Sequence, residues 1–492
     1  MKTLPSHAIV FATCVTLSGM QTRKDLYQAH RFMTQRLGSA LLHGEPDLPE
    51  SPMRRYNVAT FAGILLLVLI AAGFGIWGML KPGGATKLKE AGQLLIEEET
   101  GAAYVYNQGD GKLQRVENYV SARLLLGNQE VRVRTVSAES LAGFARGRRV
   151  GIAGAPDSLP KPDRLVTSPW TVCVAEQTDA AGVRRPYVTL LGGIDVGGTP
   201  VGGDALVVND GRHDWVLWNN HRLLAKNLRR LTDQAPRRVP ISWVNAIPAG
   251  PDLVAMEIAR RGTRTAGPGG SPARVGQVFT LAAVPGAQDR WYVLLADGLA
   301  PISHTQAMLL LQDPDSKLAY GRGRVRPIAV DAAEVNAARM SAQRVLGGGL
   351  PTTMPRFRTP GGSTPLCAGY AGTSRGSAQA QLTTGAAIAI PQPPSSGGPD
   401  HVDQVLLPPG GAALAGQLAG EGQPVNEYSL VTDEGRRFRL ASAEVVGMLG
   451  YDAARVAPVP AHLLRLIPEG PLLDPAAARK PVQESGGPAG RS

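Results

Sequence analysis

One serine in the sequence has the spacing of a catalytic nucleophile. Gly372-Thr-Ser374-Arg-Gly376 matches the pattern G-x-S-x-G, in which a serine on a sharp turn between a buried strand and a helix attacks a carbonyl carbon. Here the pattern lies in a stretch rich in glycine and serine that continues as SAQAQLTTG. We therefore interpret Ser374 as a loop residue and not as a nucleophile.

Phosphate binding and metal binding have their own sequence requirements. A P-loop needs G-x-x-x-x-G-K-[ST], so that backbone amides surround the phosphates and the lysine reaches them. Gly111-Lys112 lacks both the earlier glycine and the following hydroxyl residue, and the glycine clusters at 267–270 and 347–349 are typical of loops. No ATP site is therefore evident. No histidine pairs with cysteine or carboxylate residues at metal-ligand spacing. The sequence thus predicts no catalytic, cofactor-binding or metal-binding residue.

The three cysteines offer a different chemistry, the disulfide bond. Cys14 precedes a long apolar segment, whereas Cys173 and Cys367 both follow it. A pair on one side of a membrane suits a disulfide in an oxidising compartment, although two buried free thiols remain an alternative. A bridge of about 190 residues would stabilise the fold by up to ~5 kcal/mol.

The apolar segment predicts the element that organises the chain. From Val58 to Leu80 the sequence has no charged side chain, and a helix of that length spans about 35 Å, enough to cross a bilayer core of about 30 Å. Arg54 and Arg55 precede it and Lys81 follows it. We expect a single transmembrane helix over 58–80. Positive charge does not decide its orientation. The pair of cysteines and the size of the folded segment after the span favour placing the long C-terminal part outside the cytoplasm.

The residues before the span predict a helix with one apolar face. Leu26, Met33, Leu37 and Leu41 recur at helical spacing between arginines and lysines. This segment is too short to bury these side chains by itself. We therefore expect them to dock on a partner protein or, less favourably, on the membrane surface. Residues 1–19 are interpreted as an extension or an early start, with Met20 as the expected true start, and a proline-rich hinge completes a cytoplasmic segment over 20–57.

Several local signals predict the structure that follows the span. Leu94–Ile96 and Tyr104–Tyr106 are typical of strands, and Asp110-Gly111 of the turn after them. Asn118 is a helix cap before a helix ending at Gly127, and Ser303 with Gln306 has capping-box spacing.

A divergent internal repeat predicts how this region is divided. Val239–Leu253 and Val459–Leu473 share Val-Pro, Ile-Pro, Gly-Pro and a final leucine, and each follows a strand pattern that begins with an aromatic residue. Units too small to be stable alone pack on one another in such arrays. We predict an α+β fold with an elongated extracytoplasmic region of four small α/β repeats around a β-rich central domain. The repeats are expected at 81–160, 210–287, 288–345 and 424–475, the central domain at 161–209 with 346–423, and a disordered tail at 476–492.

Composition limits the classes of partner. The net charge of +11 comes from scattered arginines with acidic residues between them, without the basic stripe and interleaved aromatic residues of a nucleic-acid-binding surface. We therefore expect no nucleic acid partner. A basic surface facing anionic lipid or cell-wall polymer is the simpler interpretation.

The order of these segments resembles a known family. The block QAHRFMTQRLGSALLHGEPDLPESPMRR, the single span, ETGAAYVYNQGDGKLQRVENYVSARLLLG, GIAGAPDSLP at 151–160 and the two cysteines are similar to the EccB subunits of the actinobacterial type VII, or ESX-type, secretion machinery. The resemblance covers residues 20 to 475. It implies a short cytoplasmic N-terminus, one transmembrane helix, four extracytoplasmic repeats around a central domain, and Cys173–Cys367 as the family's disulfide.

The resemblance implies a function built on binding. We expect a membrane-anchored structural subunit of a secretion complex that docks on other membrane subunits and the motor ATPase and self-associates outside the cytoplasm. Family members have been described as ATPases, so an extracytoplasmic nucleotide hydrolase is one alternative, with ATP as the only cofactor implied. A cell-wall-binding module is the other.

Overall fold

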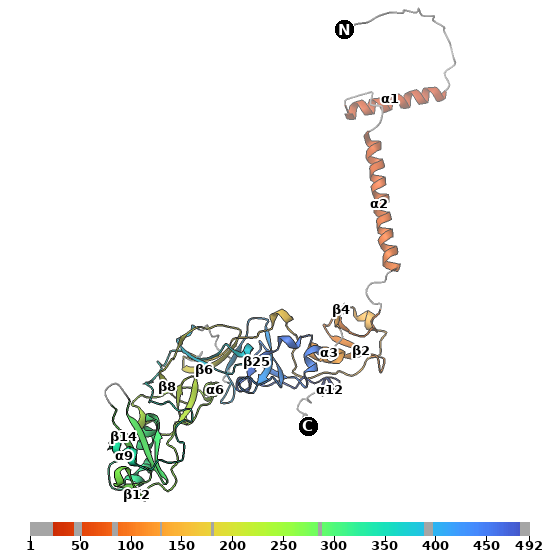
Figure 1. The fold of residues 1–492 in the computed structure, drawn as a ribbon. Helices are drawn as coiled ribbons and strands as arrows, with labels where there is room; N and C mark the ends of the chain where they lie inside the picture. Colours follow the sequence, from red (N-terminus) through yellow and green to blue (C-terminus); the bar gives the residue numbers. More distant parts are fainter. Residues whose placement is uncertain are drawn as a thin grey trace, which may run out of the picture. The chain divides into compact units, whose positions relative to one another are not determined.

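A computed structural model describes residues 23–43, 52–80, 87–127, 130–178, 182–283, 288–387 and 397–482. The chain divides into a first unit up to residue 86 and a second unit from residue 87 (Figure 1). The interpretation of residues 1–19 as an extension, and the expected proline-rich hinge before residue 52, lie outside the described residues.

The first unit consists of two helices, α1 (Arg23–His43) and α2 (Pro52–Leu80). Proline at the first position of α2 suits a helix start, because the amide it lacks would have no intrahelical partner there. Within α2, residues Arg55–Trp77 form the one described helix that is long and apolar enough to cross a membrane, with a mean hydropathy of 2.4 and no buried residue in the most apolar stretch.

Four small sheets in the second unit share one strand order. In each, three strands run antiparallel in sequence, and a fourth strand pairs in parallel with the first. The first sheet holds β1 (Gln93–Glu97), β2 (Ala103–Asn107), β3 (Lys112–Arg115) and β4 (Arg132–Val136). The second holds β8 (Ala205–Asn209), β9 (Asp214–Trp218), β10 (His221–Ala225) and β11 (Arg237–Arg238), with β18 (Phe357–Arg358) added beside β8.

The third and fourth small sheets repeat this order. The third holds β14 (Val278–Leu281), β15 (Arg290–Leu295), β16 (Gly298–Ile302) and β17 (Ile328–Val330). The fourth holds β22 (Ala412–Leu418), β23 (Tyr428–Thr432), β24 (Arg437–Arg439) and β25 (Ala457–Pro460). A separate pair, β12 (Arg264–Ala266) and β13 (Pro272–Arg274), lies between the second and third sheets in sequence.

Short helices accompany the sheets, and the predicted caps are confirmed. Asn118 accepts a hydrogen bond from the Ser121 amide at the start of α3, which ends before Gly127, and Ser303 with Gln306 forms a capping box on α7. The helices are α3 (Tyr119–Leu126), α4 (Ala138–Leu141), α5 (Leu228–Leu231), α6 (Ile241–Asn245), α7 (His304–Gln312), α8 (Lys317–Tyr320), α9 (Ala332–Ala337), α10 (Glu444–Met448), α11 (Ala461–Leu464) and α12 (Pro475–Ala478).

The two similar sequence windows follow the same backbone course. Each begins within or directly after the fourth strand of its sheet and turns through a short helix that starts after a proline, α6 or α11. The chain then returns beside the third strand. In the second sheet this return forms parallel bridges from Arg222 to Ala249 and from Ala225 to Leu253. In the fourth sheet, equivalent bridges join residues 437 to 469 and 440 to 473. The shared Val-Pro, Ile-Pro and Gly-Pro pairs therefore mark one structural motif.

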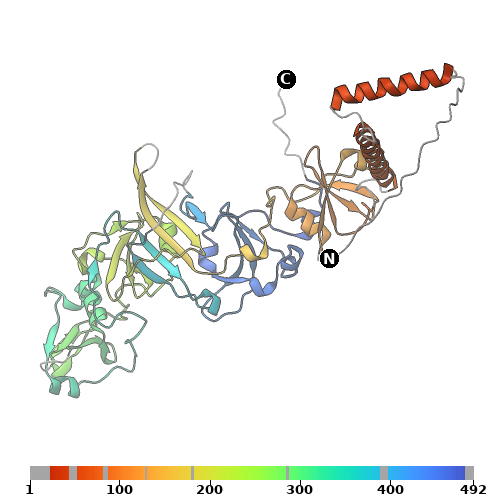
Figure 2. The same cartoon turned by 90° about the horizontal axis from the view of Figure 1, so that it is seen from above.

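The central sheet has six strands in the order β21-β6-β5-β19-β20-β7. It draws on two distant parts of the sequence: β5 (Trp170–Thr178), β6 (Arg184–Gly192) and β7 (Thr199–Pro200), and then β19 (Leu366–Tyr370), β20 (Gln381–Thr384) and β21 (Gln404–Leu406). The long hairpin of β5 and β6 is yellow in Figure 2. Antiparallel pairing of β5 with β19 sets Cys173 directly opposite Cys367.

The predicted boundaries at 210, 288 and 424 each fall one strand too late. β8, β14 and β22 pair within the second, third and fourth small sheets, whereas the predicted division leaves each of them in the preceding segment. The first strand of each sheet lies between its second and fourth strands. The prediction began each of these units at its aromatic strand, β9, β15 or β23, which is the second strand of its sheet.

The sheets are joined through shared hydrophobic cores. One core unites the central sheet with residues of the second and fourth small sheets, around Trp170, Trp243 and Tyr370. Another joins α3 of the first sheet region to the fourth sheet, around Leu124 and Phe438. A third joins the second small sheet to Leu309 of α7. Packing between sheets thus stabilises units that would be too small alone.

The predicted disordered tail is wrong over residues 476–482. Asp474 caps α12, and Ala478 is fully buried in the core shared by the first and fourth sheets. Pro481 then forms an antiparallel bridge with Val150, and the Val482 amide donates to the Arg149 carbonyl at 3.0 Å. A composition of alanine and proline suggested disorder, but one buried alanine and backbone pairing order this segment. Residues 483–492 lie outside the described part of the chain.

Candidate functional site

Helix α1 presents its apolar side chains to solvent. The four residues predicted for docking, Leu26, Met33, Leu37 and Leu41, are 61%, 65%, 59% and 83% exposed. Two exposed aromatic residues were not predicted, Tyr27 and Phe32, and the Arg36 guanidinium lies 5.1 Å from the centre of the Phe32 ring. Their positions next to Leu26 and Met33 in the sequence were the signal from which they could have been predicted.

Helix α2 is exposed in the same way. Val58, at the start of the predicted span, is 61% exposed, and Leu80 is the last residue of the helix. Trp77 is exposed near the C-terminal end, the position of an aromatic residue at a lipid–water boundary. Apolar side chains over such a length have their lowest free energy in hydrocarbon and not in water.

The disulfide lies inside the central sheet. Cys173 and Cys367 are bonded across 194 residues of sequence, with their Cα atoms 4.1 Å apart, and both are almost fully buried. Leu191 and Ala386 pack beside them. The bond therefore ties the two distant halves of the central sheet together and has no exposed sulfur for exchange chemistry.

The serine of the G-x-S-x-G pattern lies on a short 3₁₀ turn, Thr373–Arg375, after β19. Ser374 is exposed, and a strand, β20, follows the turn where a nucleophile elbow would have a helix. Among the described residues, no hydrogen bond or ion pair joins Ser374 to a histidine. Within the same residues no group of three histidine, cysteine or acidic side chains could hold a metal ion.

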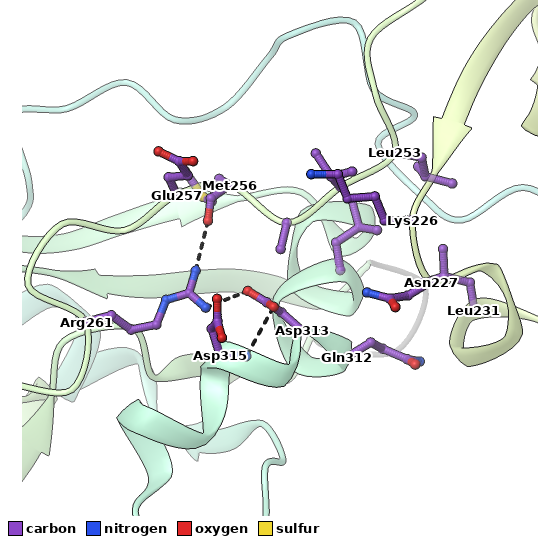
Figure 3. Close-up of a pocket in the computed structure, with 13 residues that line it drawn as sticks. Lys226, Asn227, Leu231, Leu253, Met256, Glu257, Arg261, Gln312, Asp313 and Asp315 are labelled. Carbon is purple, nitrogen blue, oxygen red and sulfur yellow. Dashed lines mark hydrogen bonds and ion pairs between the residues drawn. The ribbon is translucent and has the colours of Figure 1, made fainter. Parts of the chain in front are cut away.

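A cavity of about 340 Å³ lies between the second and third small sheets (Figure 3). Its lining mixes apolar residues such as Leu253 with charged ones, among them Lys226, Glu257 and Asp315. Arg261 forms an ion pair with Asp313 and donates to the Met256 carbonyl at 3.0 Å. The Arg261 guanidinium is thus already paired within the protein.

A polar cluster that the sequence did not reveal lies where three sheets meet. Tyr370, at the end of β19, is fully buried, and its hydroxyl donates to the Ala246 carbonyl at 2.5 Å. The same oxygen lies 2.8 Å from Nε2 of His462 in α11. Burial lowers the pKa of His462 to about 4; the charges of Arg222 and Arg465 act in the same direction, and the Ala246 carbonyl acts against them. Burial raises the pKa of Tyr370, because it disfavours the charged phenolate. Both groups are therefore neutral near pH 7.

These features define a class of protein. It is an α+β chain with one helix of membrane-spanning length, an amphipathic helix before it, and a β-rich, disulfide-linked unit after it. The family described as "Type VII secretion system ESX-1, transport TM domain B", the EccB family, matches residues 20–483. The chain belongs to this family and is a single-pass membrane protein of type VII secretion.

Curated relatives match along most of the chain. It is 28% identical over 499 residues to the ESX-3 secretion system ATPase EccB3 of Mycolicibacterium smegmatis, covering 92% of this chain and 90% of that protein. It is 27% identical over 477 residues to the ESX-1 secretion system ATPase EccB1 of Mycobacterium tuberculosis, covering 93% and 94%. The family's arrangement therefore extends over both units.

Solved structures have the same fold. A chain of an intact ESX-5 inner membrane complex matches with a TM-score of 0.59 and 23% identity, covering 97% of this chain and 98% of that one. A chain of the EccB3 dimer from the ESX-3 core complex matches with a TM-score of 0.56 and 24% identity, covering 79% and 99%.

Proposed function

We propose that this protein is a membrane-anchored core subunit of a type VII secretion complex, with α1 in the cytoplasm and the unit from residue 87 outside it. It assembles with the other membrane subunits and the motor ATPase, and it self-associates through the outer unit. The observation that carries this proposal is the family match over residues 20–483 together with two helices whose apolar side chains are exposed. Relatives are known from an inner membrane complex and as a dimer.

The proposed mechanism is positioning through binding. Helix α2 holds one region on each side of the bilayer, α1 contributes exposed apolar side chains for docking on a partner protein, and the disulfide keeps the central sheet intact. We propose further that the four small sheets are four copies of one unit around the central sheet. Their common strand order and the shared return of the chain beside the third strand support this.

Deletion of α1 tests the proposed role. Full-length protein with a C-terminal affinity tag is purified from detergent-solubilised membranes, with and without residues 23–43. We expect the deletion to stay in the membrane but to lose the other secretion subunits. A matched control, Lys24→Gln with Arg31→Gln, changes only the polar face and should retain them. Normal recovery of all partners by the deleted protein would contradict the proposal.

Nucleotide hydrolysis is the second candidate function, because the curated relatives are named as ATPases. Its test is ATP turnover by the purified full-length protein in detergent with Mg²⁺. Turnover that follows this chain through two chromatography steps and is lost on a single substitution, with the thermal unfolding temperature unchanged, would support an enzyme. Turnover that separates with the motor ATPase would reject it.

A further inference from the structure

The contact between His462 and Tyr370 joins three regions that lie far apart in the sequence. His462 belongs to α11, which follows the fourth strand of the fourth small sheet. Tyr370 ends a strand of the central sheet, and Ala246 follows α6 of the second small sheet. Two hydrogen bonds therefore connect the second sheet, the central sheet and the fourth sheet at one point, which we call the joint.

The joint is satisfied when His462 is neutral. The phenol of Tyr370 has one proton, which it donates to the Ala246 carbonyl at 2.5 Å. Its oxygen is then the acceptor for the proton on Nε2 of His462, at a distance of 2.8 Å. Each hydroxyl and each imidazole nitrogen has a fixed capacity to donate and accept. The neutral Nε2–H tautomer fits this arrangement. Protonation at Nδ1 leaves both hydrogen bonds in place, so its cost comes from burial of the charge and from the neighbouring cations.

The surroundings of His462 disfavour a positive charge. The charged groups that act on the imidazole are Arg222 and Arg465, and both are cations. Arg222 is held in place, because it donates to the Asn245 side chain at 2.6 Å and its guanidinium lies 5.2 Å from the centre of the Trp215 ring. The remaining titratable neighbour, the Tyr370 phenol, is neutral over the physiological range. Protonation of His462 therefore adds a third cation, and no carboxylate among the described residues acts on it.

We propose that this joint is a proton-sensitive contact, in which protonation of His462 in acid loosens α11 of the fourth small sheet from α6 of the second. The disulfide-linked central sheet contains no such group in its contact between β5 and β19, so it stays folded while the joint opens. The orientation of the fourth sheet against the second would thus respond to the acidity of the compartment.

The sign of the effect follows from linkage. His462 has a pKa of about 4 in the closed joint, against 6.5 for an ordinary histidine. The open joint therefore binds protons more readily, and stability of the closed form is lost as pH falls below 6.5. With these two values, the equilibrium between closed and open joint shifts toward opening about thirtyfold between pH 7.5 and pH 5.

Hydrogen exchange of the full-length protein in detergent micelles tests this directly. Exchange is measured at pH 7.5 and pH 5 by mass spectrometry and corrected for the intrinsic pH dependence of the amide rate. We expect peptides within 457–467 and 240–250 to exchange many-fold faster at pH 5, with the opening equilibrium rising by about thirtyfold. Peptides of the third sheet, within 298–312, should show little change.

Two variants separate protonation from a general effect of acid. His462→Gln stays neutral at both pH values, so the acid-induced increase should shrink to less than about threefold. The matched control His304→Gln alters a histidine that packs on Trp291 in the third sheet region and should leave the increase at the joint unchanged. If His462→Gln does not fold, the test remains the comparison, in the wild-type protein, of the joint peptides with the peptides of the third sheet. An equal increase in all peptides, or an undiminished increase in His462→Gln, would overturn the proposal.

Discussion

Helix α2 and the central sheet are both apolar, but the side chains of α2 are exposed whereas those of the sheet are buried. The exposed apolar side chains of α2 run from 51% for Ile70 to 75% for Phe61 and Phe74. In the central sheet, Trp170, Val172 and Val174 of β5 are fully buried against their neighbours. The sheet shares a hydrophobic core with the second and fourth small sheets, whereas the helix has no such core among the described residues of its unit. An apolar sequence thus specifies burial, and the length of the run decides whether protein or lipid provides it.

The largest expected effect concerns helix α2, the exposed region of this comparison. Leu67→Arg with Ile70→Arg sets two charges in the middle of α2, each costing about 2.5–3.5 kcal/mol at the centre of a membrane-spanning helix. We expect loss of membrane retention, measured by fractionation and extraction with sodium carbonate. Leu67→Val with Ile70→Val should behave as wild type. Full retention of the arginine variant would mean that α2 is not the anchor.

A buried tryptophan tests the second region, the core around the central sheet. Trp243 is 1% exposed and its indole donates to the Val172 carbonyl at 3.2 Å, so Trp243→Ala should lower the free energy of unfolding of the outer unit by about 3–5 kcal/mol. Trp77→Ala, at a position 65% exposed, should change that free energy by less than about 0.5 kcal/mol. Urea unfolding followed by circular dichroism measures both. Equal losses would remove the distinction between the two regions.

The disulfide should have a somewhat smaller effect. Cys173→Ala with Cys367→Ala should lower the free energy of unfolding by about 2–4 kcal/mol, because the unfolded chain is no longer closed across 194 residues. Dithiothreitol present during unfolding, when the sulfurs become exposed, should destabilise the wild-type protein by a similar amount and leave the double variant unchanged. If the reductant affects both proteins equally, the stabilisation comes from another source.

The smallest effect on stability belongs to α1. Met33→Asp with Leu37→Asp replaces two side chains that are already exposed, so the unfolding of the outer unit should change by less than about 0.5 kcal/mol. The same change should reduce co-purification of partner subunits at least tenfold, measured by quantitative mass spectrometry. Retained partners would show that another surface is responsible for docking.

Local features were the ones that the sequence predicted well. The uncharged run ending at Leu80, the cap at Asn118 and the capping box at Ser303 are properties of a few neighbouring residues, and each has one physical reading. The similar windows after Val239 and Val459 exposed a shared motif for the same reason, since Pro240 and Pro460 both precede a short helix.

Features that depend on distant pairing were missed. The first strand of each of the last three small sheets was assigned to the wrong segment, because the prediction began each unit at the aromatic strand that follows it. The joint could not be foreseen either, because Tyr370 and His462 are 92 residues apart and Tyr370 lies outside the repeated windows. Order at Ala478 depends on a pocket formed by α3 and the fourth sheet, which composition alone does not report.

Protease accessibility in intact cells tests the central claim most directly, namely that α2 crosses the membrane and separates α1 from the outer unit. The full-length protein carries one tag before α1 and another after residue 492, and a protease that cannot cross the membrane is added from outside once the cell wall has been removed. We predict that the C-terminal tag is lost while the N-terminal tag and α2 remain as one protected fragment. Loss of both tags, or protection of both until the membrane is broken, would contradict the account.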